Sequence, residues 1–273
     1  MEQRVCIVAE SGSAQPWLLY GVLQALPEDA ATDFLTRAGL GIFSLPIRLC
    51  STAALTAVGS VLPPKQSLSQ PSQADLIDYA RIIQTAHERA VIAPLRFGSM
   101  LDGEVAVRAY LEEHRAPYRQ LLDDLAEVEE LAVRIYLSTD IALAQSATET
   151  PASVPGSGSG AEYLRQRRLQ HARRAQGEAV AQQHTSWVLT ELAEQIRSHK
   201  IELALDRSQP VASLALLVRR RESFQIKRQL TAAAQAASIR LSVSGPFPPY
   251  SFAVLAALPG DRPAVAMDCE GTQ

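Results

Sequence analysis

The stretch that decides the fold is Ser72–Ser99, SQADLIDYARIIQTAHERAVIAPLRFGS. Ser72 followed three residues later by Asp75 is typical of a capping box and predicts that a helix begins there. One stripe of mostly apolar residues then recurs at steps of three and four, as on a helix with one buried face. The stripe comprises Leu76, Ala80, Ile83, His87 and Ala90. Pro94 ends the helical pattern, and Pro94–Phe97 is predicted to be a short strand.

Four further elements are expected on the N-terminal side of this helix. Val5–Ala9 is a short apolar run with β-branched residues, which indicates a buried strand. Apolar residues at helical spacing over Trp17–Leu26 predict a helix that ends at Pro27. Gly41–Leu49 and Ala53–Val61 are predicted strands joined by a tight turn. The N-terminal part therefore has the predicted order β-α-β-β-α-β.

The C-terminal side repeats this order. Residues 102–127 are predicted to be helical with a break at Pro117, and a second series of elements follows them. Its elements are a strand at Leu131–Leu137, a long helix at Ala161–Lys200, strands at Ile201–Leu205 and Val211–Val218, a helix at Glu222–Ala237 and a strand at Ile239–Val243. The repeated order is typical of the ferredoxin-like split βαβ fold. The sequence therefore predicts an α+β protein with two ferredoxin-like (βαββαβ) domains joined by a helical connector.

The predicted domain limits follow from these elements. Residues 1–99 form the N-terminal ferredoxin-like domain, and residues 100–127 form the helical connector. Residues 128–252 form the C-terminal ferredoxin-like domain, and residues 253–273 are a tail. Residues 145–160 (QSATETPASVPGSGSG) are of low complexity and are expected to be mobile.

Composition excludes several classes of protein. The 273 residues carry 26 Lys and Arg against 29 Asp and Glu, a net charge of −3, which argues against a strongly basic nucleic-acid binder. Aromatic residues make up 5%, too few for a protein that binds single strands by stacking. The sequence has no run of about 18 apolar residues, so no membrane span is expected. Cys6, Cys50 and Cys269 lack the spacing of a metal site or disulfide framework, which favours a reducing cytoplasm.

Motifs for catalysis and for cofactor binding are missing from the sequence. It contains neither a phosphate-binding loop nor a dinucleotide-binding glycine pattern. No two of the five histidines have the i, i+4 spacing of a helical zinc site. His87 is expected to be a core-edge histidine bonded to backbone, and the pairs Asp123–Asp124 and Glu129–Glu130 are expected to be solvated surface. We therefore predict no catalytic residue, no cofactor and no metal.

A basic cluster is the remaining charged feature. It comprises Arg165, Arg167, Arg168, Arg173 and Arg174. Together with Arg219–Arg221 it forms either a positive patch for an acidic partner or a solvated helix face. The candidate RNA-binding strand Leu214–Val218 has no stacking aromatic residue, so no nucleic-acid partner is expected.

Two segments are more specific than a general fold pattern. The first is His87–Arg89 leading into Ala93–Ser99, and the second is Ser244–Phe252, SGPFPPYSF. Their order and separation resemble those of the gas vesicle protein F/L family (GvpF/GvpL), over about residues 5–252. The matching residues are His87, Pro94, Arg96, Phe97, Gly98, Gly245, Pro246, Phe247, Pro248, Pro249, Tyr250 and Phe252.

The chain also departs from the family pattern. Phe247 stands where the family usually has Trp, and Leu131–Ala132 where a Trp-Gly pair is common. Cys6–Val8 stands where the family usually has a Tyr-rich first strand. These departures indicate a divergent paralogue.

The resemblance implies a fold of two α/β domains and an accessory role in gas vesicle formation, and hence in buoyancy, with no established catalytic activity. It implies the hydrophobic shell protein and other gas vesicle accessory proteins as partners, and a cytoplasmic location at gas vesicles. The motif residues are expected to serve either architecture or partner contact, with Arg96 in a buried ion pair or a stacking contact. The element order alone supports an alternative, a ligand-binding regulatory module of paired ferredoxin-like domains.

Overall fold

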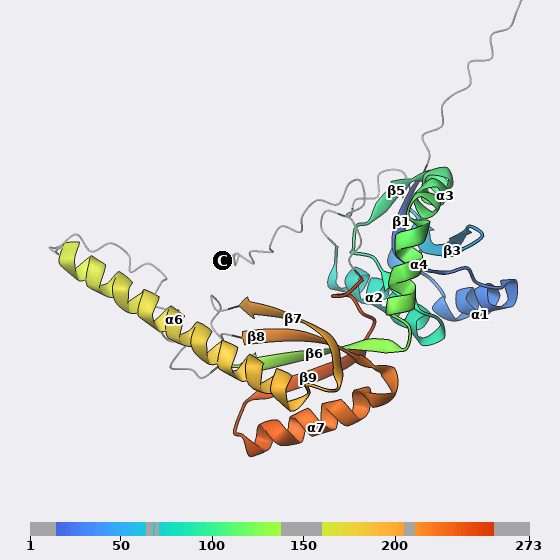
Figure 1. Cartoon of the computed structure of the whole chain (residues 1–273). Coiled ribbons are helices and arrows are strands. Elements are labelled where there is room, and N and C mark those ends of the chain that lie inside the picture. Colours follow the sequence, from blue (N-terminus) through green and yellow to red (C-terminus); the bar gives the residue numbers. More distant parts are fainter. Residues whose placement is uncertain (1–14, 64–67, 69–70, 138–159, 205–210, 254–273) are drawn as a thin grey trace, which may run out of the picture. The chain divides into compact units, whose positions relative to one another are not determined.

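The structure is a computed structural model that describes residues 15–63, 68, 71–137, 160–204 and 211–253 (Figure 1). The chain divides into two compact units. Unit 1 is formed by residues 1–125 with 253–273, and unit 2 by residues 126–252. The predicted strand at Val5–Ala9 and all but the last residue of the segment 145–160 lie outside the described residues.

Unit 1 combines an antiparallel sheet with helices. Its described elements are β1 (Pro16–Gln24), α1 (Glu28–Ala38), the 3-10 turn η1 (Ile42–Ser44), β2 (Ile47–Ser51), β3 (Leu55–Val61), α2 (Gln73–Arg89), β4 (Ile92–Pro94), β5 (Met100–Asp102), α3 (Gly103–Glu113) and α4 (Arg115–Asp124). The strands lie in the order β2-β3-β1-β4. The short strands β4 and β5 pair with successive parts of the same edge of β1.

β1 is a central strand, and the prediction of a helix at Trp17–Leu26 is wrong. The strand is buried without interruption from Trp17 to Leu23. A strand that is covered on both faces shows no alternation of apolar and polar residues, so its sequence does not distinguish it from a buried helix. Gly21 permits the close approach of β4, since a Cβ at this position would lie 2.6 Å from the Ile92 side chain.

Helices cover both faces of the unit 1 sheet. Leu18 and Tyr20 of β1 pack in one hydrophobic cluster with Phe34 of α1 and Ile83 of α2. Side chains alternate along a strand, so the residues between these point to the other face. There α3 contacts β1, β2 and β3, and α4 contacts β1 and β4. The helices that were predicted as a connector therefore pack on the sheet of unit 1, and Pro117 lies in the first turn of α4.

The capping box at the start of α2 is confirmed. The Asp75 N–H donates to Ser72 Oγ at 3.2 Å, and the Ser72 N–H donates to the Asp75 carboxylate at 2.8 Å. The predicted buried stripe is confirmed only at Ile83 and His87, because Leu76 and Ala80 are exposed. The helix instead buries Tyr79, Ile82, Ile83, Ala86 and His87. A stripe through Tyr79 and Ile82 fits helical spacing equally well and removes more apolar surface from water.

Unit 2 contains a four-stranded antiparallel sheet. Its described elements are β6 (Val128–Tyr136), α6 (Gly160–Glu191), β7 (Ile196–Ala204), β8 (Val211–Arg219), the 3-10 turn η2 (Arg220–Glu222), α7 (Ser223–Ala236) and β9 (Leu241–Phe247). The strands lie in the order β7-β8-β6-β9. Leu131, Val133 and Ile135 of β6 pack in one cluster with Val188 of α6 and Leu230 of α7.

The prediction of helix as far as Lys200 is wrong, whereas the other elements predicted in unit 2 are confirmed to within a few residues. α6 ends at Glu191, and Ile196 already pairs with Val218 of β8. Residues between Ala193 and Lys200 are mostly polar and carry no clear period, so pairing with β8 decides their conformation.

The two sheets share one strand order. In each unit the first and third strands of the β-α-β-β-α-β series are central, and the second and fourth lie at the edges. All of these strand pairs are antiparallel. The chain therefore has a mixed α/β fold with two antiparallel sheets. The element order predicted for unit 2 is confirmed. In unit 1 the prediction rested partly on wrong elements, since the predicted helix at Trp17–Leu26 is β1 and only the last three residues of the predicted strand at Gly41–Leu49 belong to β2.

Candidate functional site

The first motif lies in the loop that follows β4, and Tyr79 fixes this loop to the sheet. The Tyr79 hydroxyl lies 2.8 Å from the carbonyl oxygen of Leu19 and 3.0 Å from those of Leu95 and Arg96. Its ring packs edge-on against Phe97, with the ring centroids 5.2 Å apart. Tyr79 was not predicted as a motif residue, because its partners are carbonyl oxygens that carry no sequence signal.

The remaining residues of the first motif are partly buried and partly exposed. Pro94 and His87 are buried, the latter as expected for a core histidine. Gly98 has a φ of +91°, a region that side chains disfavour, and nothing lies within 4 Å of where a Cβ would be. The Arg96 side chain is exposed, so the buried ion pair expected there is wrong.

Removal of the Tyr79 hydroxyl tests this anchoring. We expect Tyr79→Phe to lower the free energy of unfolding by about 1–3 kcal/mol, because the buried carbonyl oxygens lose a donor while the ring packing stays. The matched control is Tyr136→Phe, whose hydroxyl makes an exposed 3.3 Å contact with Ser242. Chemical denaturation of both variants provides the measurement, and equal losses would contradict the anchoring role.

The second motif forms the end of β9 and the turn after it. Gly245 has a φ of +110°, and a Cβ there would lie 2.9 Å from the Glu130 carbonyl oxygen. Pro248 and Pro249 are buried, and the Tyr250 N–H donates to the Pro248 carbonyl oxygen at 2.7 Å. The motif thus makes a compact turn against β6.

The Glu130 carboxylate anchors this turn. It accepts hydrogen bonds from the Ser251 N–H at 2.8 Å and from the Ser251 hydroxyl at 2.9 Å. Burial raises the pKa of Glu130, and the hydrogen bonds from Ser251 and the charge of Lys200 offset part of that rise. The buried carboxylate of Glu130 is therefore hydrogen-bonded to Ser251, which lies within the second motif.

The prediction that Glu129–Glu130 is a solvated pair is wrong. The two side chains point to opposite faces of β6, as adjacent residues on a strand do, but both are buried. Glu129 lies 3.7 Å from Arg220. The partners lie about 90 and 120 residues further along the sequence, which is why local pattern did not reveal them. Asp123–Asp124 is exposed, as predicted.

Two aromatic rings of the second motif face solvent in part. Phe247 and Tyr250 are each 37% exposed. Burial, and then the negative charge of Glu130, raise the pKa of Tyr250 to about 12. The Lys200 ammonium lies 5.8 Å from the centroid of the Phe252 ring. The motif therefore combines a buried anchor with exposed aromatic surface.

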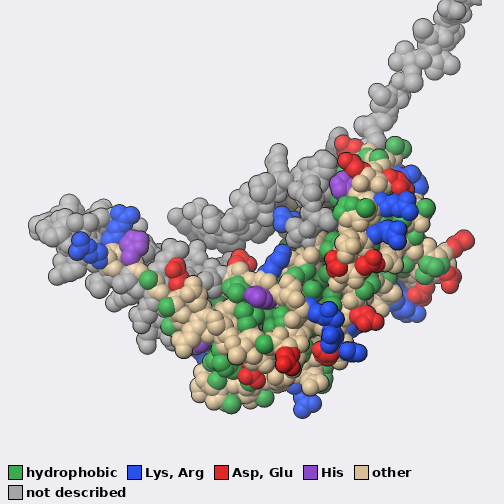
Figure 2. Space-filling model, viewed as in Figure 1, with side chains coloured by type: hydrophobic (Ala, Val, Ile, Leu, Met, Phe, Trp, Pro, Cys, Tyr) green, Lys and Arg blue, Asp and Glu red, His purple; other side chains and the backbone are tan. Residues whose placement is uncertain are grey.

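The basic residues of the predicted cluster lie in two settings, on α6 and on the segment that ends β8 and forms η2. Arg219 and Arg221 form ion pairs with Glu222 at 3.2 and 3.4 Å, and Arg220 forms one with Glu129. All three arginines are therefore paired with carboxylates of unit 2. Arg167 and Arg168 are exposed on α6, where Figure 2 shows basic side chains near the start of the helix. The side chains of Arg165, Arg173 and Arg174 lie outside the described residues.

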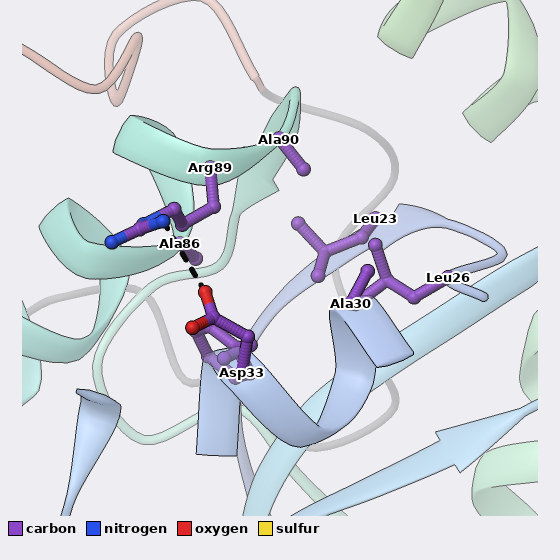
Figure 3. Close-up of a pocket in the computed structure, with 8 residues that line it drawn as sticks. Leu23, Leu26, Ala30, Asp33, Ala86, Arg89 and Ala90 are labelled. Atoms are coloured by element: carbon purple, nitrogen blue, oxygen red, sulfur yellow. Dashed lines mark ion pairs between the residues drawn. The ribbon is translucent and has the colours of Figure 1, made fainter. Parts of the chain in front are cut away.

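Unit 1 also contains a pocket that the sequence did not predict (Figure 3). It has a volume of about 210 Å³ and lies between the end of β1, α1 and α2. Its lining residues are Leu23, Leu26, Ala30, Asp33, Phe34, Ala86, Arg89 and Ala90. An ion pair of 3.2 Å between Arg89 and Asp33 stands beside the apolar side chains. A cavity of about 150 Å³ is known to hold benzene, so this pocket has room for one apolar side chain.

Metal and membrane features complete the description. Within the described ranges, no three His, Cys, Asp or Glu side chains are placed to hold a metal ion. None of the helices searched is both long and apolar enough to cross a membrane. Cys50 is buried and unpaired with another cysteine.

Known proteins resemble the chain over most of its length. The family model "Gas vesicle synthesis protein GvpL/GvpF" matches residues 16–254. Gas vesicle protein L of Streptomyces sp. (strain CB03234) is 30% identical over 236 residues, which cover 79% of this chain and 86% of the relative. Gas vesicle protein F of the same strain is 24% identical over 220 residues, which cover 78% of this chain and 90% of the relative.

Solved structures share the fold. The crystal structure of GvpF from Anabaena sp. PCC7120 superposes with a TM-score of 0.67 at 18% identity, over 90% of this chain and 98% of that one. The crystal structure of GvpF from Microcystis aeruginosa superposes with a TM-score of 0.65 at 17% identity, over 88% of this chain and 99% of that one.

The family match also corrects the placement of the first strand. It begins at residue 16, the first residue of β1, so Trp17–Val22 with its Tyr20 occupies the position that was given to Cys6–Val8. The tyrosine within this apolar run was the signal that could have found it. With the family model matching residues 16–254 of 273, the chain belongs to the gas vesicle synthesis protein GvpL/GvpF family.

Proposed function

We propose that this chain is a non-enzymatic accessory protein of gas vesicle assembly, which binds the hydrophobic shell protein or other gas vesicle proteins. Family membership over residues 16–254 is the observation that carries the proposal. The same membership supports action in the cytoplasm, at the forming gas vesicle. A hydrophobic shell subunit needs its apolar surface covered before it assembles, and an accessory protein can supply that cover.

Unit 1 has surface features suited to an apolar partner. The pocket shown in Figure 3 has room for one apolar side chain of a partner, and the ion pair between Arg89 and Asp33 lies beside it. Leu40 and Ile77 are 54% and 60% exposed. Arg81, one helical turn after Ile77, donates to the Leu40 carbonyl oxygen, which brings these two side chains to the same region. Adjacent exposed apolar side chains commonly mark an interaction site.

We assign the family-motif residues to two roles. Gly98, Gly245 and Ser251 serve architecture, since the two glycines adopt positive φ values and Ser251 bonds to Glu130. Tyr79 and Glu130 lie outside the motifs and hold the two motif segments in place. The exposed side chains of Arg96, Phe247 and Tyr250 are proposed as partner contacts, since an arginine and half-exposed aromatic rings are the types that dominate binding energy in interfaces.

Filling the pocket tests the binding role. Ala30→Leu on α1 places a larger side chain in the pocket, and a buried leucine contact is worth about 1.5–3 kcal/mol. We therefore expect capture of co-expressed shell protein to fall about tenfold or more. The matched control is Thr32→Leu, which adds a leucine to the exposed side of the same helix, outside the pocket.

The capture experiment separates the alternatives. Equal capture by both folded variants would exclude the pocket as the contact, and Arg96→Ala and Tyr250→Ala would then test the motifs. Failure of the wild-type protein to capture the shell protein would exclude that partner and direct the same assay to the other accessory proteins.

We also infer that both units belong to the ferredoxin-like class, supported by their common strand order. The domain boundary proposed here lies near residue 126, with α3 and α4 in the first domain. The pocket supports a second candidate function, a ligand-binding regulatory module. A thermal-shift screen against metabolites distinguishes it, because a ligand that binds only the folded state raises the midpoint in a saturable manner.

A further inference from the structure

Two helices carry the most exposed large hydrophobic side chains of the described surface. Val105 on α3 is 84% exposed and Phe224 on α7 is 71% exposed. α3 belongs to unit 1 and α7 to unit 2. Neither side chain contributes to the core of its own unit, so both are available to an external partner.

The exposed face of α7 carries an aromatic ring, a basic side chain and two small alanine side chains. The Arg228 guanidinium lies 6.0 Å from the centroid of the Phe224 ring, which orders both side chains. Ala232 and Ala236 continue this exposed face, one turn apart, and leave room for a close approach. Residues 223–252 contain no Asp or Glu.

The outer face of α3 has the opposite charge. Val105, Ala109, Glu112 and Glu113 recur at helical spacing and are exposed. Arg108, the single basic residue of α3, is engaged by the Glu104 carboxylate at 3.0 Å and by the Ser51 carbonyl oxygen at 2.7 Å. The face therefore presents one apolar side chain at its start and two carboxylates at its end.

The two faces match in length and in the order of their charged and small side chains. Val105 to Glu113 and Arg228 to Ala236 each comprise nine residues, and their first and last residues lie about 12 Å apart along the helix axis. An antiparallel arrangement of these spans places Glu112 and Glu113 opposite Arg228, Ala109 opposite Ala232, and Val105 opposite the small side chain of Ala236. We propose that α3 of one copy of this chain docks against α7 of a second copy, an inference that is independent of the proposed function.

The geometry of this contact determines the kind of assembly. Different surfaces of the two copies meet, so the contact is head-to-tail and each copy keeps one free α3 face or one free α7 face. Such contacts build either closed rings or open chains. One pair of helices buries less surface than a standard interface, so the association is weak, with a Kd on the order of 10 µM to 1 mM.

Complementary charge reversals test the contact in the full-length protein. Sedimentation velocity at rising protein concentration and low salt is expected to show reversible association of the wild type. Arg228→Glu alone, and the double variant Glu112→Lys with Glu113→Lys alone, are each expected to raise the Kd at least about tenfold. A mixture of these two proteins is expected to associate again, because the carboxylates of the first variant's α3 then meet the arginine of the second variant's α7.

Two further variants separate this contact from general charge effects. Val105→Ala keeps the charge and is expected to weaken association through lost apolar contact, whereas Arg197→Glu, an exposed position on β7, is expected to leave it unchanged. A wild-type protein that stays monomeric up to about 1 mM, or an equal mixture of the two reversal variants that fails to associate, would overturn the proposal.

Discussion

Gly245→Ala is expected to destabilise the protein by about 3 kcal/mol or more. A side chain at a φ of +110° costs about 1–2 kcal/mol of backbone strain. The added Cβ would also lie 2.9 Å from the Glu130 carbonyl oxygen, which belongs to the backbone of β6 and cannot rotate away. β9 must then shift from β6, at a further cost of about 1–3 kcal/mol for an overpacked site.

The matched control for this variant is Gly98→Ala. Gly98 also has a positive φ, +91°, but its Cβ position has open space around it. Only the backbone strain remains, so a loss of about 1–2 kcal/mol is expected. Chemical denaturation measures both variants, and a loss at Gly245 no larger than the loss at Gly98 would refute the close packing of β9 on β6.

Glu130→Ala is expected to cost about 3 kcal/mol. The Ser251 N–H and hydroxyl both donate to this carboxylate, and hydrogen bonds to a charged group contribute about 1.5–3 kcal/mol each. Burial of the charge opposes part of that gain, since it raises the pKa of Glu130. Glu130→Gln keeps the shape of the side chain and one acceptor oxygen, and it removes the buried charge. We therefore expect this variant to lose only about 1 kcal/mol of the free energy of unfolding.

The stabilities of the wild type and of Glu130→Gln are expected to depend on pH in different ways, and the direction of the difference follows from the pKa of Glu130. The folded-state pKa of Glu130 lies above its unfolded value, so between these two values the folded state binds more protons than the unfolded state. Stability is therefore lost as the pH rises from the unfolded pKa through the folded one. The wild type is expected to lose stability relative to Glu130→Gln across that window, and Glu129→Gln is the control. Parallel pH curves for wild type and Glu130→Gln would contradict the assignment.

Sequence pattern predicted the elements whose determinants are local. The Ser72–Asp75 capping box is contained in four residues, and the break before α4 follows from Pro117. The same reasoning failed for β1, because burial of Trp17–Leu23 on both faces removes the alternation that identifies a strand.

The candidate site was predicted less completely than the fold. The Gly- and Pro-rich motif after β9 stood out in the sequence, but its anchor did not. The hydrogen-bond partner of Glu130 is Ser251, 121 positions further along the sequence, and the adjacent Glu129 has its partner on η2. The pocket beside Asp33 and Arg89 likewise joins α1 and α2 across more than 50 residues.

The central claim is that this chain acts in gas vesicle assembly through contacts with other gas vesicle proteins. The most direct measurement is a count of gas vesicles by electron microscopy in a strain that lacks this gene and any redundant paralogue, complemented with the wild type or with the Ala30→Leu variant. We predict loss of vesicles on deletion, recovery with the wild type and poor recovery with the folded variant. Normal vesicle numbers in the uncomplemented strain would contradict the claim.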